Sequence, residues 1–229
     1  MKARTIMEIS MLTTVPTALF LCAYFEVQAA ALLTALVAVA SFIPFFANFE
    51  RSRPAPSEIM PIVVLSAAAV VGRVMLAPIP NFQPVSALVI FTGLYFGRGS
   101  GYLMGAFSAL VSNIILGQGM WTPWQMYAWG VMGFVCGLLT EKGVLQSGKK
   151  RGIYAYGIIA SFLYGLLLDT WFIVAFVYDV NAGSALAAYG AGLVMNISHV
   201  SSTVIFLALT LGPLGRKIER VKMKYGLGS

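Results

Sequence analysis

The distribution of positive charge constrains the fold of this chain more than any other sequence feature. All but one of its 15 Lys and Arg residues lie outside eight apolar stretches, and every second connection between those stretches holds none of them. Lys and Arg concentrate in the cytoplasmic loops of membrane proteins. The pattern therefore predicts an all-α integral membrane protein with eight transmembrane helices and both termini in the cytoplasm. Arg73 is the exception, because it lies inside an apolar stretch.

The composition is that of a chain whose surface faces lipid. It is 59% hydrophobic and 10% charged, with a mean hydropathy of +0.84, whereas soluble domains are about 25% charged. The net charge of +7 is explained by cations at helix ends, facing lipid headgroups, so nucleic acid is not an expected partner. Cys22 and Cys136 both lie inside apolar runs, a placement that indicates neither a disulfide framework nor a zinc site.

The apolar stretches set the expected helices, since about 20 apolar residues cross a bilayer. The first stretch follows Lys2 and Arg4 without a small-x-small cleavage pattern, so we expect an uncleaved helix rather than a signal peptide. The predicted spans are 6–25, 28–48, 59–78, 85–97, 100–117, 122–141, 153–177 and 184–212.

A polar, Pro-rich connector divides these helices into two groups. Residues 1–50 form a predicted two-helix N-terminal transmembrane extension, 51–57 a cytoplasmic linker, and 58–229 a six-helix core with a basic cytoplasmic tail. Small residues recur at every fourth position in the core, which allows helices to pack closely within the chain or against another subunit. They are Ala68 and Gly72; Gly101, Gly105 and Ala109; Gly133 and Gly137; and Ala188 and Gly192.

Catalytic motifs are missing from the sequence. It has one His, no phosphate-binding loop of the G-x-x-x-x-G-K-[ST] type, no H-E-x-x-H motif and no carboxylate pair on one helix. We therefore expect no enzyme, cofactor or metal site. A stand-alone secondary transporter or channel remains an alternative; it should show an internal repeat and intramembrane ion-coupling groups.

Amides and indoles gather in the connections that the charge pattern places outside and at the helix ends beside them. Such side chains can bind a flat molecule with polar edges, although an aromatic belt at the headgroup level is the alternative. The candidate binding residues are Asn81, Gln83, Asn113, Gln118, Trp121, Trp124 and Gln125. Arg73 and Asp169 are added because they lie at similar depth with opposite charge. A charge inside the bilayer is costly unless it is paired, so we expect these two to pair, with a ligand contact or snorkelling of Arg73 as alternatives.

Three stretches of the predicted core together resemble a known family. They are 80–85, 101–113 and 117–126, the last reading Gly-Gln-Gly-Met-Trp-Thr-Pro-Trp-Gln-Met and followed by Trp129 and Gly130. Residues 58–215 are similar to the substrate-binding (S) components of energy-coupling-factor (ECF) transporters, which import vitamins into bacteria. Within that family the chain most resembles the branch assigned to cobalamin (vitamin B12). The two additional N-terminal helices depart from the usual six-helix pattern.

The resemblance implies a function and partners. It implies a six-helix core in the bacterial cell membrane that binds a micronutrient from outside and docks on a transmembrane coupling subunit, which carries two ATPase subunits. In this family a small-x-x-x-small motif of the first core helix contacts the coupling subunit, and Ala68 and Gly72 match it. Cobalamin, with its amide arms and one phosphate, is the expected substrate; another vitamin or precursor is the alternative.

Overall fold

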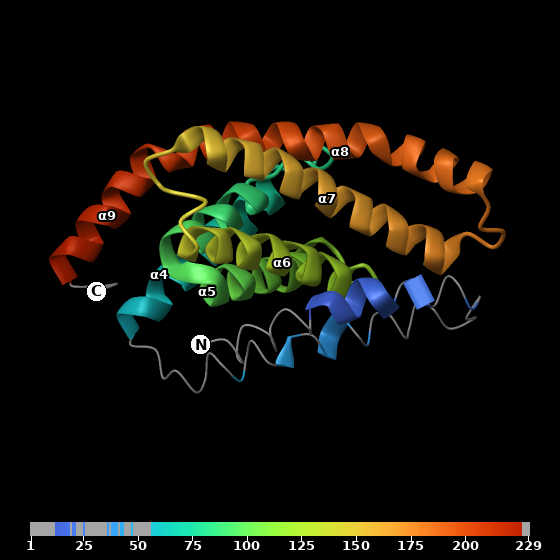
Figure 1. Cartoon of the computed structure of the whole chain (residues 1–229), viewed down its shortest axis with the longest axis horizontal. Helices are drawn as coiled ribbons and strands as arrows, with labels where there is room; N and C mark the ends of the chain where they lie inside the picture. The colour runs from blue at the N-terminus through green and yellow to red at the C-terminus, as the bar shows by residue number, and fades with distance from the viewer. Residues whose placement is uncertain are drawn as a thin grey trace.

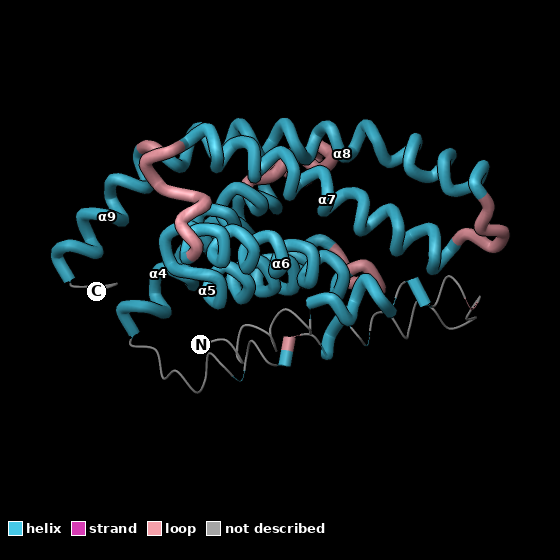
Figure 2. Tube along the Cα trace, in the orientation of Figure 1, coloured by secondary structure: helices cyan, strands magenta, loops and turns pink. Residues whose placement is uncertain are grey.

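The computed structural model of the chain describes residues 12–18, 20, 21, 25, 36, 38–40, 42, 43, 47 and 56–225. Every regular element within these residues is a helix, as predicted (Figure 2). The predicted extension of residues 1–50 and the linker 51–57 lie largely outside the described residues. The continuous part consists of α4 (Pro56–Met75), α5 (Val85–Leu116), α6 (Thr122–Glu141), α7 (Lys150–Phe176), α8 (Ala182–Leu211) and α9 (Pro213–Tyr225).

Three of the described helices, α5, α7 and α8, are long and apolar enough to cross a membrane. The 27 residues of α7 and the 30 residues of α8 exceed the about 20 that a bilayer crossing requires. Figure 1 shows these two helices side by side along the longest axis of the molecule. The fold is thus that of an all-helical chain with helices suited to a bilayer.

The helix α5 is divided by a sharp kink. Gly97 has φ 86° and ψ 171°, a conformation that L side chains rarely adopt. A Cβ atom on Gly101 would lie 2.8 Å from the Cα atom of Gly93, whereas eight residues of a straight helix span about 12 Å. The two halves of α5 therefore fold back on each other, which confirms the predicted break between 85–97 and 100–117. As a result, Val85 and Leu116 lie at the same end of the molecule.

Glycines let both halves of α5 approach α6. A Cβ atom on Gly101 would lie 2.6 Å from the carbonyl oxygen of Gly133, and one on Gly105 would lie 2.5 Å from the backbone of Trp129. A Cβ atom on Gly137 would overlap the backbone of Arg98. These small residues therefore allow the helices to pack closely within the chain, which is one of the two roles that the sequence predicts for them.

The two long helices α7 and α8 are joined by polar contacts and a short turn. Asn181 starts α8: its side chain accepts hydrogen bonds from the backbone N–H groups of Gly183 and Ser184, and the Ser184 hydroxyl accepts one from the Asn181 N–H. Along the pair, Ser161 donates to Thr203 over 2.8 Å. The hydroxyl groups of Thr170 and Tyr189 also lie 2.8 Å apart, near the turn.

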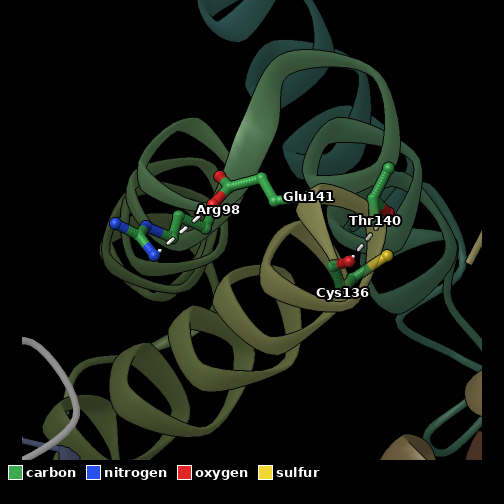
Figure 3. A network of polar contacts seen from close by, with 4 residues as sticks. All are labelled: Arg98, Cys136, Thr140 and Glu141. Atoms are coloured by element: carbon green, nitrogen blue, oxygen red, sulfur yellow. Dashed lines mark hydrogen bonds and ion pairs between the residues drawn. The ribbon is translucent and has the colours of Figure 1, made fainter. Parts of the chain in front are cut away.

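Cations gather at one end of the bundle, which we call the basic end. Figure 1 shows the 142–149 loop and α9 at this end of the molecule. Leu214 and Ile218 of α9 pack against the core, whereas Arg216 and Lys217 are exposed. Figure 3 shows the Arg98 side chain, from the start of the second half of α5, reaching Glu141 at the end of α6 with an N–O distance of 3.4 Å. This ion pair joins α5 to α6 at the basic end.

Candidate functional site

Three of the predicted binding residues come together around a fourth, Arg73, which lies in the last turn of α4. Its Nε atom donates to Gln83 Oε1 over 2.9 Å, and its Nη1 atom donates to Asn113 Oδ1 over 2.9 Å. Its Nη2 atom donates to Gln125 Oε1 over 3.2 Å, and Nη1 also donates to the hydroxyl of Ser112. We call these five residues the Arg73 network.

The fold-back of α5 makes this convergence possible. Gln83 precedes α5 and Asn113 lies near its end, so only a chain reversal at Gly97 can bring both to one guanidinium. The helix α6 contributes Gln125 to the network and places Thr122 beside it. Asn113 Nδ2 donates to Gln125 Oε1 over 2.8 Å and to the Thr122 hydroxyl over 3.0 Å. The network is thus built where α4, α5 and α6 meet, at the end of the bundle opposite the basic end.

The Arg73 network is buried within the protein. Arg73 is 8% exposed, Gln83 9% and Asn113 1%, while Gln125 is half-buried. A buried polar group that lost its partner would carry a desolvation cost of about 1–3 kcal/mol. The amides therefore hold the guanidinium in one position, and Gln125 marks the side on which the network comes closest to the surface.

Aromatic and polar side chains continue the network into the core. The Arg73 guanidinium lies 5.0 Å from the centroid of the Trp129 ring, and Trp129 Nε1 donates to the Ser86 hydroxyl over 2.9 Å. Ser86 Oγ is 2.5 Å from His199 Nε2, and the Tyr164 ring packs against the rings of both Trp129 and His199, with centroid distances of 4.8 and 4.4 Å. We call Ser86, Trp129, Tyr164 and His199 the aromatic floor.

Sequence reasoning missed Ser112 and the aromatic floor as parts of the site. One helical spacing carried a usable signal: Trp129 follows Gln125 by one turn and so shares its face of α6. The position of Ser112 next to Asn113 carried none, because successive residues of a helix point about 100° apart. Ser86, Tyr164 and His199 carried none, because their contacts join α5, α7 and α8, which are far apart in sequence. No three His, Cys, Asp or Glu side chains come together in the described residues as a metal site would require.

The prediction that Arg73 and Asp169 form a pair is wrong. Asp169 accepts a hydrogen bond from Asn196 of α8 over 2.8 Å, and its carboxylate lies against Gly192, where a Cβ atom would come within 2.6 Å of it. Asn196 in turn occupies the notch left by Gly165. Asp169 thus joins α7 to α8, whereas Arg73 joins α4 to α5 and α6.

The other predicted binding residues lie outside the Arg73 network. Asn81 is exposed and donates to the Met195 carbonyl over 3.4 Å, and Gln118 is exposed and donates to the Leu110 carbonyl over 3.2 Å. Trp121 is 44% exposed. Trp124 is fully buried on a different side of α6, where its ring stacks on Trp171 at a centroid distance of 6.2 Å.

The two predicted docking residues have different surroundings. Ala68 is exposed on α4, beside the exposed Val64 and Val71. Gly72 is half-buried, and a Cβ atom there would overlap the ring of Pro84. Ala68 therefore lies on an exposed, apolar face of α4, while Gly72 lets the segment that carries Gln83 pack against α4.

The fold and this site define the class of the protein: an all-helical chain with helices suited to a bilayer and a buried polar network around one arginine. Residues 54–216 match the family of unknown function DUF6580, and the chain belongs to that family. The match covers α5 to α8 and the whole Arg73 network. No solved structure matches the chain.

Proposed function

We propose that this protein is the S component of an ECF-type vitamin importer, with cobalamin as its preferred substrate. In this proposal eight helices cross the bacterial cell membrane, two of them forming the N-terminal extension, and both termini are cytoplasmic. The chain captures its substrate outside and delivers it inward when docked on a coupling subunit with two ATPase subunits. No ATP hydrolysis is assigned to the chain itself.

One observation carries the proposal: the Arg73 network. Amides, a hydroxyl and a guanidinium from α4, α5 and α6 meet at the end of the bundle that the charge pattern predicts to be external. Polar groups in a binding site fix the orientation of a bound molecule by hydrogen bonding to its polar edges. Cobalamin carries many amide arms, which such a network can hydrogen-bond. Because cobalamin is large, only its periphery would reach Arg73, and its ring would lie between the network and the outside.

Binding to a vitamin panel tests the proposal. The full chain is purified in neutral detergent and titrated calorimetrically with cobalamin, riboflavin, biotin, pantothenate, thiamin and folate. Saturable binding of one of them, cobalamin first, is the expected result. Co-purification of a coupling subunit and two ATPases from the native membrane would support the S-component assignment. Binding to no vitamin would overturn it and favour the secondary transporter or channel.

The proposed topology makes a labelling prediction. The variants Gln118→Cys and Gly148→Cys flank α6 at its two ends, and both sites are open: Gln118 is exposed, and nothing lies within 4 Å of a Cβ atom on Gly148. In a Cys22→Ser background, a membrane-impermeant maleimide added to intact cells should label position 118 and spare position 148. Cys136 is buried and should stay unlabelled. The reverse labelling would place the Arg73 network inside the cell.

Docking on the coupling subunit should depend on Ala68. The substitution Ala68→Trp places a bulky ring on the exposed face of α4, where close approach of another helix requires small residues. We expect co-purification of the coupling subunit to fall severalfold while the isolated chain still binds its vitamin. Ala187→Trp is the matched control, since Ala187 is exposed on α8. Normal assembly of the Ala68→Trp variant would remove this face from the interface.

A further inference from the structure

Arg73 carries a buried positive charge that no acidic side chain of the described residues neutralises. Its hydrogen-bond partners Gln83, Ser112, Asn113 and Gln125 are all neutral, and Trp129 offers only the face of its ring. Two ionisable side chains interact with it electrostatically: Tyr164, a phenol that is neutral at physiological pH, and His199, which carries no negative charge in any form. Asp169, the carboxylate that the sequence suggested as its partner, accepts a hydrogen bond from Asn196 instead.

Hydrogen bonding and charge compensation are separate requirements at a buried arginine. The four bonds to neutral side chains occupy four of the five N–H groups that a guanidinium offers. They do not supply an opposite charge, and burying an uncompensated ion costs several kcal/mol even after relaxation. Arg73 is 8% exposed and has no opposite charge beside it among the described residues, so its guanidinium is suited to pairing with a bound anion.

The geometry points to an anionic substrate: we propose that the captured molecule carries a carboxylate or phosphate group that pairs with the Arg73 guanidinium. This inference rests on the proposed function and narrows its substrate class. The anion approaches from the side of Gln125, which is half-buried and whose 3.2 Å contact with Nη2 is the longest of the measured Arg73 bonds. When the anion displaces it, Gln125 Oε1 still accepts from Asn113 Nδ2. Trp129 covers a face of the guanidinium, and the anion binds at its edge through Nη2, whose only bond within the described residues is the one to Gln125.

Matched pairs of ligands that differ by the anionic group test this inference. The full chain in neutral detergent is titrated with cobinamide phosphate and cobinamide, biotin and biotin amide, and pantothenate and panthenol. In the pair that binds, the anionic member should bind at least about tenfold more tightly than the neutral member. In Arg73→Gln that preference should fall to within about twofold. Arg98→Gln is the control: Arg98 pairs with Glu141 at the basic end, and the preference should be unchanged.

The variant Arg73→Lys provides a second test that does not depend on the folding of Arg73→Gln. Lysine keeps the charge without the planar fork, so it should keep a preference for the anionic member while binding it more weakly than the wild type does. Equal binding of both members by the wild type, or an undiminished preference in Arg73→Gln, would overturn the anionic substrate and leave the proposed function standing. Binding of no vitamin and no pair member would overturn both.

An anionic lipid headgroup offers the same chemistry as a soluble anion. Phosphatidylglycerol is therefore titrated into the micelles, with dodecylmaltoside alone as the reference, and unfolding temperature is measured for wild type and Arg73→Gln. We expect no Arg73-dependent stabilisation by the lipid and no competition with the soluble anion. Stabilisation by phosphatidylglycerol that Arg73→Gln abolishes, without binding of any soluble anion, would assign the site to a lipid and overturn the anionic substrate.

Discussion

The substitution Gly133→Leu is expected to keep α5 and α6 from packing and to destabilise the protein by about 3 kcal/mol. A Cβ atom on Gly133 would overlap the carbonyl group of Gly101 and lie 2.9 Å from its Cα atom. Backbone atoms cannot rotate away as a side chain can, so the two helices would have to separate. Since Gly93 also packs against Gly133, the separation would disturb both halves of α5.

A matched substitution in α5 separates this effect from that of leucine itself. A Cβ atom on Gly99 meets nothing within 4 Å, so Gly99→Leu should shift the unfolding temperature little. Both variants and the wild type are compared by thermal unfolding in detergent and by the yield of monodisperse protein. An unfolding temperature of Gly133→Leu equal to that of the wild type would show that the α5–α6 contact is not close.

Removing the Asn113 amide should weaken both the Arg73 network and vitamin binding. In Asn113→Ala the side chains of Arg73, Thr122 and Gln125 each lose a partner, and three of the four residues concerned are nine-tenths buried or more. Each lost buried bond costs about 1–3 kcal/mol, so we expect the vitamin affinity to fall roughly tenfold to a hundredfold. The unfolding temperature should fall as well.

Calorimetric titration with the vitamin that the wild type binds measures this change. Gln146→Ala is the control, because Gln146 is exposed in the loop at the basic end and its side chain donates only to the Gly143 carbonyl. The affinity of Gln146→Ala for the vitamin should match that of the wild type. Unchanged affinity in Asn113→Ala would move the site away from the Arg73 network, toward the side of the bundle where Asp169 joins α7 to α8.

The helical class, the break within residues 85–117 and part of the site were predictable from sequence. Long apolar stretches indicate helices, because lipid offers no hydrogen bonds to the backbone and a helix bonds its backbone polar groups within its own segment. Arg73 was predictable as a site residue because a charge in an apolar helix is rare and costly. Gln83, Asn113 and Gln125 were predictable because they flank helix ends on the same predicted side as Arg73.

Side-chain direction limited the prediction of the remaining site residues. Trp124 and Gln125 are neighbours in sequence, but successive residues of a helix point about 100° apart, so one stacks on Trp171 and the other accepts from Arg73. Asp169 has the charge and depth to pair with Arg73, but its position on α7 turns it toward Asn196. Depth along a helix is readable from sequence, whereas the direction around its axis depends on which helices pack against it.

The sequence by itself determined an all-helical chain with apolar helices and an isolated arginine within one of them, because hydropathy and charge act residue by residue. The tertiary structure alone decided the partners of that arginine. The reversal at Gly97 brings Gln83 and Asn113 to one guanidinium, and the packing of α7 and α8 brings Tyr164 and His199 beneath Trp129. Contacts between segments far apart in the chain depend on how closely the helix backbones approach, and glycines such as Gly101 and Gly133 set that distance only once the helices are packed.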